Sequence, residues 1–233
     1  MSTLRTSQCD LMDFFRESSF DPDERLISVP DSLFQKRLFD ISLLILALPL
    51  LVPLLFIVSG MVLLVSRGPV IFRQERVGRM GRRFMCYKFR TMRVDAETVV
   101  HQQHLNELIR SELPMTKLDN KGDTRLIPFG RLLRATGLDE LPQCFNVLRG
   151  EMSLIGPRPC TPYEFQYYLP SQKKRFQVPP GITGLWQVSG KNKTTFTQMA
   201  EFDVFYATNH SIRMDLEILL LTVPVVVRQI VGR

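Results

Sequence analysis

An uncharged run of 26 residues, ISLLILALPLLVPLLFIVSGMVLLVS at positions 41–66, constrains this chain more than any other feature. About 20 apolar residues are enough for a helix to cross the hydrocarbon core of a bilayer, and buried helices of soluble domains are usually shorter. The run therefore predicts a helix that enters a membrane. A buried core helix of a soluble domain is the less favoured interpretation.

Two prolines, Pro49 and Pro53, lie one turn apart inside this run. Each removes a backbone donor and disfavours a straight helix. Lys36 and Arg37 precede the run and Arg67 follows it, so both ends are basic. A spanning helix is expected to have its basic bias at one end only. We therefore favour a re-entrant helix that returns to the face it entered from, and a kinked spanning helix stays the alternative.

Charge is distributed unevenly along the 233 residues, whose net charge is +7. Residues 1–35 hold seven acids and three arginines, which gives −4 and leaves +11 on the rest. This pattern predicts a loosely ordered acidic extension, followed by a basic body that suits a polyanionic partner. The four cysteines and three histidines form no disulfide framework or zinc motif, so reduced thiols in the cytosol are the simplest interpretation.

Nine basic residues and one acid occupy positions 67–93. Residues 70–72 and 84–87 have the composition of short strands, and Gly78 and Gly81 lie between them, which predicts a β-hairpin with a cationic face. The face could contact anionic lipid head groups or the phosphates of a substrate, and an active site at a membrane edge needs both. Downstream we expect a polar helix over 95–113, a solvated loop over 118–128 and a helix over 129–136.

The segment 138–148, LDELPQCFNVL, has apolar residues at helical spacing. The spacing predicts one helix with Leu138, Leu141, Phe145 and Leu148 on one face. Asp139 and Glu140 then lie at its N-terminus, where the helix dipole keeps a carboxylate ionised and favours phosphate. Pro142 fits the first turn, which needs no donor.

Two adjacent acids at a helix start more often serve as a cap than as catalytic groups. Here Arg134 and Arg149 are near in sequence, and Arg158 lies in the stiff turn GPRP. This context favours a phosphoryl-transfer site. One acid would be a nucleophile or metal ligand, and the other a metal ligand or an acid–base group.

Six motifs occur together and in order: KRLFD (36–40), the apolar run, GPVIFRQERVG (68–78), YKFRTM (87–92), the stretch from LDELPQ to GPRP (138–159), and PGITGLWQVSGK (180–191). This combination closely resembles the bacterial sugar transferase family, the monotopic polyprenyl-phosphate phosphoglycosyl transferases. The resemblance covers residues 36 to about 227. The chain resembles the minimal catalytic form, without the extra multi-helix membrane domain of larger relatives.

The resemblance implies transfer of a sugar-1-phosphate from a UDP-sugar to polyprenyl phosphate, usually undecaprenyl phosphate, with release of UMP. It implies Mg²⁺ as the cofactor and a covalent phosphosugar–aspartate intermediate. It also implies a location on the cytosolic face of the bacterial inner membrane, in the initiating step of surface-glycan assembly.

Residue roles follow from the same resemblance. Asp139 matches the family's nucleophile and Glu140 its second acid, and both are candidate magnesium ligands. The residues expected to bind substrate or lipid phosphates are Lys88, Arg134, Arg158, Lys36 and Arg37. Pro53 matches the proline that breaks the re-entrant helix, and Pro49 is a second helix-breaker. Many family members have serine before that proline, where this chain has Val52, so the bend angle stays open.

The C-terminal third gives weaker signals. Trp186 is either a core aromatic or a platform near the nucleotide or lipid. Glu201, Asp203 and Tyr206 are expected to be structural, with Asp203 also a candidate for the site. Ile218–Val227 is too short to span a bilayer and predicts an interfacial helix.

The predicted fold is mainly α with a small β-hairpin and is associated with the membrane from one side. Its parts are the extension 1–35, the re-entrant helix 36–66, a cytosolic catalytic domain 67–217 and an interfacial helix 218–233. A membrane-tethered nucleic-acid binder is disfavoured, because no recognition helix or stacking pattern accompanies the basic cluster. A catalytically inactive scaffold is disfavoured by the intact acid pair and GPRP turn. The sugar, the glycan pathway, the nucleotide base contacts, the role of the extension and the oligomeric state, a homodimer included, stay open.

Overall fold

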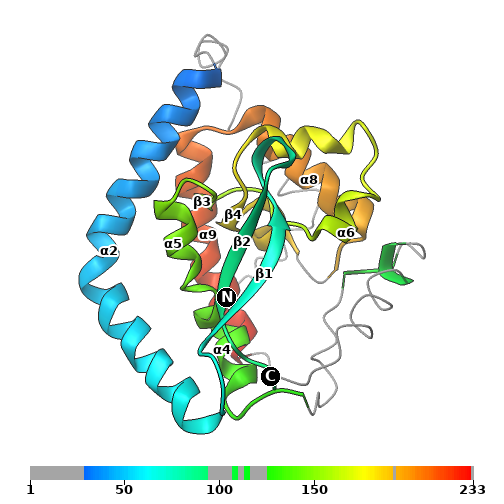
Figure 1. Cartoon of the computed structure of the whole chain (residues 1–233). Helices are drawn as coiled ribbons and strands as arrows, with labels where there is room; N and C mark the ends of the chain where they lie inside the picture. Colours follow the sequence, from blue (N-terminus) through cyan, green and yellow to red (C-terminus); the bar gives the residue numbers. More distant parts are fainter. Residues whose placement is uncertain (1–28, 94–106, 110–112, 116–124, 191–192, 232–233) are drawn as a thin grey trace, which may run out of the picture.

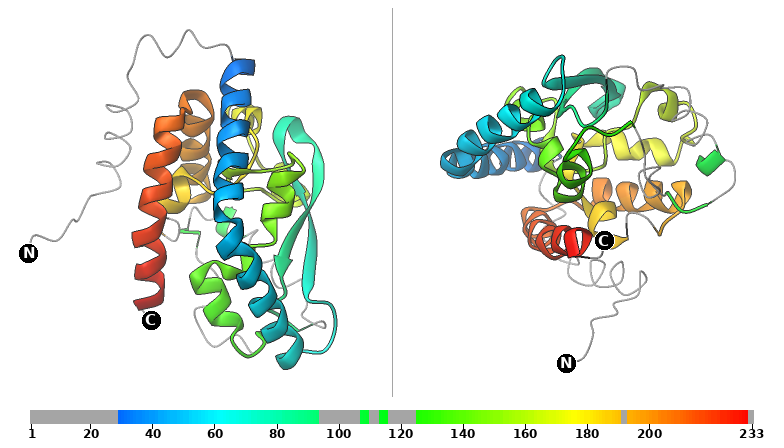
Figure 2. Two further views of the ribbon diagram at one scale, coloured as in Figure 1. Left: turned by 90° about the vertical axis from the view of Figure 1, so that its left-hand side faces the viewer. Right: turned by 90° about the horizontal axis from the view of Figure 1, so that it is seen from below.

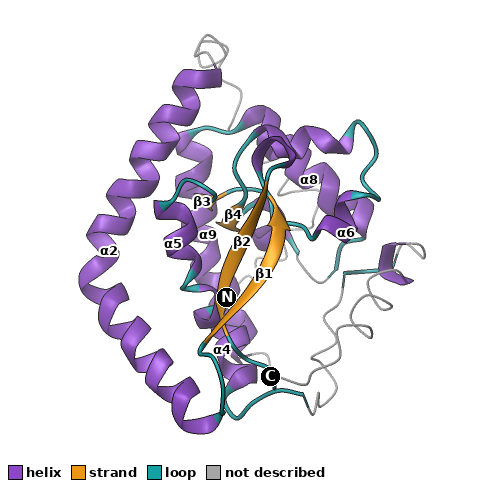
Figure 3. Ribbon diagram, in the orientation of Figure 1, coloured by secondary structure: helices purple, strands orange, loops and turns teal. Residues whose placement is uncertain are grey.

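The structure is a computed structural model that describes residues 29–93, 107–109, 113–115, 125–190 and 193–231. The predicted extension over 1–35 and the predicted polar helix over 95–113 lie largely outside these residues. The described part is mainly helical with one β-hairpin and one pair of short parallel strands (Figure 3). The predicted fold class is confirmed to that extent.

The apolar run lies in helix α2 (Val29–Val65), which contains both prolines. The helix is continuous, and its axis bends near the middle (Figure 1). The predicted break is therefore a bend, because the turns on either side of each proline keep their own hydrogen bonds. Leu44 in the first half and Val58 in the second half are buried against the body. Between them the helix faces outward, with Leu46 77% and Leu50 74% exposed.

Within the described residues, α2 is the one helix that is long and apolar enough to cross a membrane. Only 11% of its most apolar window is buried. The core helix of a soluble domain would be mostly buried, so that interpretation is not supported.

The predicted hairpin is confirmed, with longer strands than expected. Strand β1 (Ile71–Val77) pairs antiparallel with β2 (Arg83–Phe89), and the turn η2 (Arg79–Gly81) connects them. Met80 and Gly81 both have left-handed backbones, with φ of 56° and 74°. Glycine adopts this conformation without steric cost, which explains Gly81 at the point of reversal.

The segment around the acid pair differs from the prediction of one helix. Helix α4 (Gly130–Thr136) ends at Gly137, a short 3₁₀ turn η4 (Leu138–Glu140) follows, and α5 (Gln143–Leu148) begins after Pro142. Pro142 has no N–H to donate to Leu138, so the chain makes i−3 bonds here instead of continuing an α-helix. On α5, the apolar side chains of Phe145 and Leu148 are 53% and 48% exposed.

Two loops meet below the hairpin. Strand β3 (Ser153–Ile155) leads into the GPRP turn and pairs in parallel with β4 (Gly181–Thr183). The amide of Gly156 donates to Thr183, and that of Gly181 donates to Pro157, both at 2.9 Å. A Cβ on Gly156 would lie 2.5 Å from the carbonyl oxygen of Pro179, so this close approach requires glycine.

The remaining helices enclose the main core. They are α6 (Pro162–Phe165), the 3₁₀ helix η5 (Gln172–Gln177), α7 (Leu185–Ser189), α8 (Phe196–Asn209) and α9 (Ile212–Val231). Trp186 is 3% exposed in this core, and its indole donates to Thr194 at 2.6 Å. The interpretation of Trp186 as a core aromatic is thus confirmed. Helices α2 and α9 lie side by side on one side of the molecule (Figure 2).

Candidate active site

The acid pair lies in the turn η4, between α4 and α5. Gly137 has a φ of 73°, and this left-handed residue lets α4 end sharply and η4 begin. Asp139 is 8% exposed, whereas the side chain of Glu140 is 30% exposed. The two adjacent carboxylates therefore have different environments, which suits different roles.

Lys88 on β2 reaches the acid pair. Its Nζ lies 2.6 Å from Oε1 of Glu140, and both side chains are partly exposed. The sequence separates these residues by 52 positions. The structure thus brings together two of the predicted site residues, and their ion pair forms one wall of the candidate site.

Asn146 on α5 fixes the strand that carries Lys88. Its Nδ2 donates to the carbonyl of Met85 at 2.7 Å, and its Oδ1 accepts from the amide of Tyr87 at 3.1 Å. Asn146 is fully buried and also donates to Glu151 at 2.7 Å. Loss of this side chain would leave β2 backbone groups unpaired, so Asn146 sets the distance between β2 and α5.

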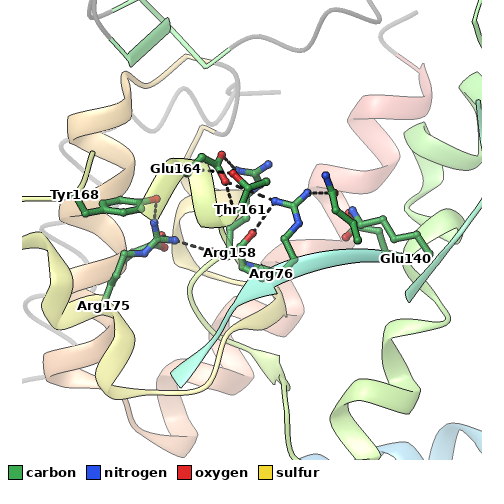
Figure 4. Close-up of polar contacts among 11 residues, drawn as sticks. Arg76, Glu140, Arg158, Thr161, Glu164, Tyr168 and Arg175 are labelled. Atoms are coloured by element: carbon green, nitrogen blue, oxygen red, sulfur yellow. Dashed lines mark hydrogen bonds and ion pairs between the residues drawn. The ribbon is translucent and has the colours of Figure 1, made fainter. Parts of the chain in front are cut away.

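The GPRP turn brings Arg158 to the same region. Nη1 of Arg158 lies 3.1 Å from Oε1 of Glu164, a residue 1% exposed in α6. Arg76 on β1 contacts the other oxygen of Glu164 at 3.6 Å and donates to the carbonyl of Pro159 at 3.2 Å. Figure 4 shows the Arg76 side chain between Glu164 and Glu140. The buried carboxylate of Glu164 therefore forms ion pairs with two guanidinium groups.

The charges of this cluster shift its pKa values in opposite directions. Burial alone raises the pKa of Glu164, but Arg158 and Arg76 outweigh it and lower the pKa to about 2. Burial lowers the pKa of Arg158, and the charges of Glu164 and then Glu140 raise it above its ordinary value. Arg158 therefore interacts electrostatically with Glu140 of the acid pair as well as with Glu164.

Behind the turn lies a second buried arginine, Arg175. It donates to the carbonyl of Arg158 at 2.7 Å and to the hydroxyl of Tyr168, and its Nη2 lies 2.5 Å from Oδ2 of Asp203. Burial raises the pKa of Asp203 to about 6, although the charge of Arg175 lowers it. Asp203 thus contacts Arg175 directly, and the charge of Arg158 also lowers its pKa.

The other predicted phosphate-binding residues lie elsewhere. Lys36 is 2% exposed, and its Nζ lies 2.5 Å from Asp215 of α9. This burial does not support a role in binding a lipid phosphate. Arg37 donates to the carbonyl oxygens of Val147 and Leu148, and so caps the end of α5. Arg134 donates to the hydroxyl of Thr91 at 2.9 Å, next to the acid pair in sequence.

Comparison with known proteins decides the family. The family model described as "Bacterial sugar transferase" matches residues 31–229, which is most of the chain. The chain belongs to the bacterial sugar transferase family. This establishes the resemblance that the six motifs indicated.

Curated relatives of this chain differ in length. It is 46% identical over 160 residues to "Galactosyl transferase CpsE" of Streptococcus agalactiae, covering 68% of this chain and 35% of the relative. It is 40% identical over 202 residues to "Undecaprenyl-phosphate galactose phosphotransferase" of Salmonella typhimurium, covering 85% and 41%. It is 37% identical over 207 residues to "Exopolysaccharide production protein ExoY" of Sinorhizobium fredii, covering 89% and 92%. The chain thus spans less than half of the first two relatives and nearly all of the third.

Sequence analysis missed several residues of the candidate site, namely Arg76, Asn146, Glu164 and Arg175. The sequence did hold a signal for Glu164, since TPYE at 161–164 is a capping box with proline at its first helical position. The box indicated a helix start, but not that its glutamate is buried beside Arg158. For Asn146 and Arg175 we find no local signal, because their partners come from distant segments.

The donor set of the acid pair fits magnesium. Mg²⁺ is usually held by one or two carboxylates together with substrate phosphates, and Asp139 and Glu140 offer two carboxylates in adjacent positions. No cluster of three or more His, Cys, Asp or Glu residues of metal-binding type occurs among the residues that the structure describes. A pair of carboxylates that requires substrate phosphates to complete the shell agrees with this finding.

Proposed function

We propose that the protein transfers a sugar-1-phosphate from a UDP-sugar to polyprenyl phosphate and releases UMP. The observation that carries this proposal is the convergence of the acid pair with Lys88 and Arg158, in a member of a family whose relatives include an undecaprenyl-phosphate galactose phosphotransferase. Nucleophilic attack on a diphosphate requires a nucleophile and cations that stabilise the phosphate oxygens. Two carboxylates near two or more cations supply these groups.

In this proposal Asp139 is the nucleophile. Its carboxylate oxygen attacks the phosphorus that bears the sugar, the phosphoanhydride bond breaks, and UMP leaves with the bridging oxygen. The phosphate of the lipid then attacks the same phosphorus, the aspartyl–phosphorus bond breaks, and the carboxylate is restored. The burial of Asp139 at 8% exposure excludes most water, which would otherwise hydrolyse the intermediate.

Nearby cations determine whether the Asp139 carboxylate can attack the negatively charged diphosphate. Arg158 and Lys88 would bind the diphosphate oxygens and reduce their repulsion of Asp139. Asp139 and Glu140 would hold Mg²⁺, which when bound supplies charge neutralisation of the phosphate oxygens. Glu140, paired with Lys88 and partly exposed, is placed to exchange protons or metal with solvent.

We also propose that the protein lies on one side of the membrane. The first half of α2 joins α9 through Lys36 and Asp215, and the carbonyl of Ser66, just past its end, accepts from Arg90 at 2.9 Å. Both ends of α2 therefore contact the same body, which supports a re-entrant helix over a kinked span. Helix α9 lies beside α2 (Figure 2), and its exposed apolar residues include Leu216, Leu220, Val223, Val227 and Ile230. This face would rest at the lipid surface of the cytosolic leaflet.

A transfer assay tests the function. Purified protein with Mg²⁺ and undecaprenyl phosphate is incubated with a panel of radiolabelled UDP-hexoses and UDP-N-acetyl sugars. We expect label in the organic phase and UMP in the aqueous phase for at least one sugar. Absence of lipid-linked label across the whole panel would refute the proposal.

Lys88→Met tests whether the ion pair between Lys88 and Glu140 contributes to transfer. We expect a loss of about 10²-fold in kcat/KM for the UDP-sugar, because removal of one stabilising donor costs about 10²–10³-fold. Arg83→Met on the same strand is the control, since its pair with Glu75 is exposed. If the two variants have equal activity, Lys88 has no role in transfer.

Accessibility to a membrane-impermeant maleimide tests the re-entrant helix. Single cysteines replace Phe34, 71% exposed, or Arg67, exposed just past the end of α2, in a chain without Cys9. We expect both positions to react in inverted membrane vesicles and neither in intact spheroplasts. Reaction of the two positions from opposite sides would establish the kinked span instead.

A further inference from the structure

Arg158 and Arg76 share one buried carboxylate, and neither the motifs nor the family comparison assigns a role to it. Oε1 of Glu164 accepts from Arg158 at 3.1 Å, and Oε2 accepts from the amide of Thr161 at 2.5 Å and lies 3.6 Å from Arg76. Two guanidinium groups therefore share one carboxylate, and Glu140 is a further acid whose charge acts on Arg158. A cluster richer in cations than in buried carboxylates suits an anionic ligand.

The two arginines are not equivalent. The side chain of Arg76 is 9% exposed, whereas that of Arg158 is 31% exposed. Arg76 also donates to Gln74 at 2.5 Å and to the carbonyl of Pro159, so its guanidinium is used within the protein. The Arg158 side chain is therefore the one that can contact a ligand, whereas Arg76 binds groups of the protein itself.

Two arginines, and not Glu164 itself, bind the backbone carbonyls of the GPRP turn. Arg76 binds the carbonyl of Pro159, and Arg175 binds the carbonyl of Arg158 at 2.7 Å. These two contacts fix the turn from opposite sides. What Glu164 adds is control of the direction of the Arg158 side chain, which would otherwise rotate freely or collapse onto Glu140.

We propose that Glu164 is a positioning residue, which holds the Arg158 guanidinium ready for the diphosphate of the nucleotide sugar. The proposal rests on the proposed function. It deepens that function by naming the group that prepares the arginine before substrate arrives. Positioning in advance lowers the entropic cost of ordering a long side chain when the substrate binds.

Glu164→Gln is the informative variant. Glutamine at this position of a capping box still accepts from the amide of Thr161, the N-cap residue, so α6 keeps its start. The ion pair with Arg158 is lost. We expect KM for the UDP-sugar to rise and kcat/KM to fall by about 10- to 100-fold, since the orientation and the charge pairing of the Arg158 guanidinium are both impaired. Glu201→Gln, an exposed carboxylate on α8, is the matched control and should retain wild-type kinetics.

A double-mutant cycle separates positioning from general structural support. Arg158→Gln alone is expected to lower kcat/KM by about 100-fold. If Glu164 acts through Arg158, Glu164→Gln adds almost nothing in the Arg158→Gln background. A multiplicative effect of the two substitutions, or wild-type kinetics of Glu164→Gln, would overturn the proposal.

A second variant and a binding measurement complete the test. If Glu164→Gln does not fold, Glu164→Asp keeps the charge with a shorter reach, and it should fold and show an intermediate rise in KM. Equilibrium binding of UDP by the variants and the wild type does not depend on turnover. Glu164→Gln should bind UDP more weakly than the wild type, and the same substitution should have no effect on UDP affinity in the Arg158→Gln background. This result supports positioning even if no sugar is transferred. UDP binding that is unchanged in Glu164→Gln overturns it, whereas absence of transfer by the wild type refutes only the proposed function.

Discussion

Asp139→Asn is expected to lower turnover by at least about 10³-fold, since removing a nucleophile that forms a covalent intermediate leaves only binding and electrostatic effects. The amide is nearly isosteric with the carboxylate but carries no charge and is a poor nucleophile. UDP-sugar binding should largely remain, because Lys88 and Arg158 are untouched. Transfer to lipid and mass-spectrometric detection of phosphosugar on the protein, with the acceptor lipid withheld, measure the two consequences.

The control for this variant is Glu75→Gln, which neutralises an exposed carboxylate on β1. It should have wild-type turnover and normal labelling. Covalent phosphosugar that persists in Asp139→Asn would remove Asp139 as the nucleophile. Phosphosugar on Glu140 in either protein would reassign the two roles within the pair.

Lys36→Met is expected to be the most destabilising of the charge substitutions considered. Lys36 and Asp215 are 2% and 1% exposed and 2.5 Å apart, and Tyr206 donates to the other oxygen of Asp215 at 2.5 Å. The variant leaves Asp215 buried without its counter-charge, which costs about 3–5 kcal/mol of unfolding free energy. Denaturant or thermal unfolding in lipid nanodiscs measures the loss. The contact also joins α2 to α9, so membrane retention should be recorded in parallel.

Arg213→Met is the matched control, because Arg213 pairs with Glu217 on the same helix but is 68% exposed. Its cost should be about 0–1 kcal/mol. Lys36→Met combined with Asp215→Leu should be more stable than Lys36→Met alone, since the uncompensated charge is removed. Equal stability of Lys36→Met and the wild type would show that the buried pair is not formed in the membrane-bound protein.

The fate of Lys36 illustrates what a motif can and cannot establish. The resemblance matched KRLFD to cations near the lipid phosphate, and charge next to an apolar run made that role reasonable. The structure pairs Lys36 with a residue 179 positions away and encloses both. Local sequence does not predict such an ion pair, because its contribution to stability depends on which distant helix packs against α2.

The segment 138–148 shows a different kind of error. Helical spacing of its apolar residues predicted one continuous helix with the Leu and Phe residues on one face. The rule assumes that apolar residues face a protein core, yet Phe145 and Leu148 are exposed beside a helix that we place in lipid. The buried positions of α5 are instead Gln143, Cys144, Asn146 and Val147, and the polar side chain of Asn146 holds β2.

By itself the sequence determined the apolar helix, the hairpin, the family and the identity of the acid pair. These properties depend on local composition, on turn residues such as Gly81, and on motifs that lie in a fixed order. The tertiary structure alone decided the partners: Glu140 with Lys88, Lys36 with Asp215, and Arg158 with Glu164 beside Arg76. An ion pair between distant segments is stable only where packing excludes water and fixes both side chains, and that environment exists only after the chain has folded.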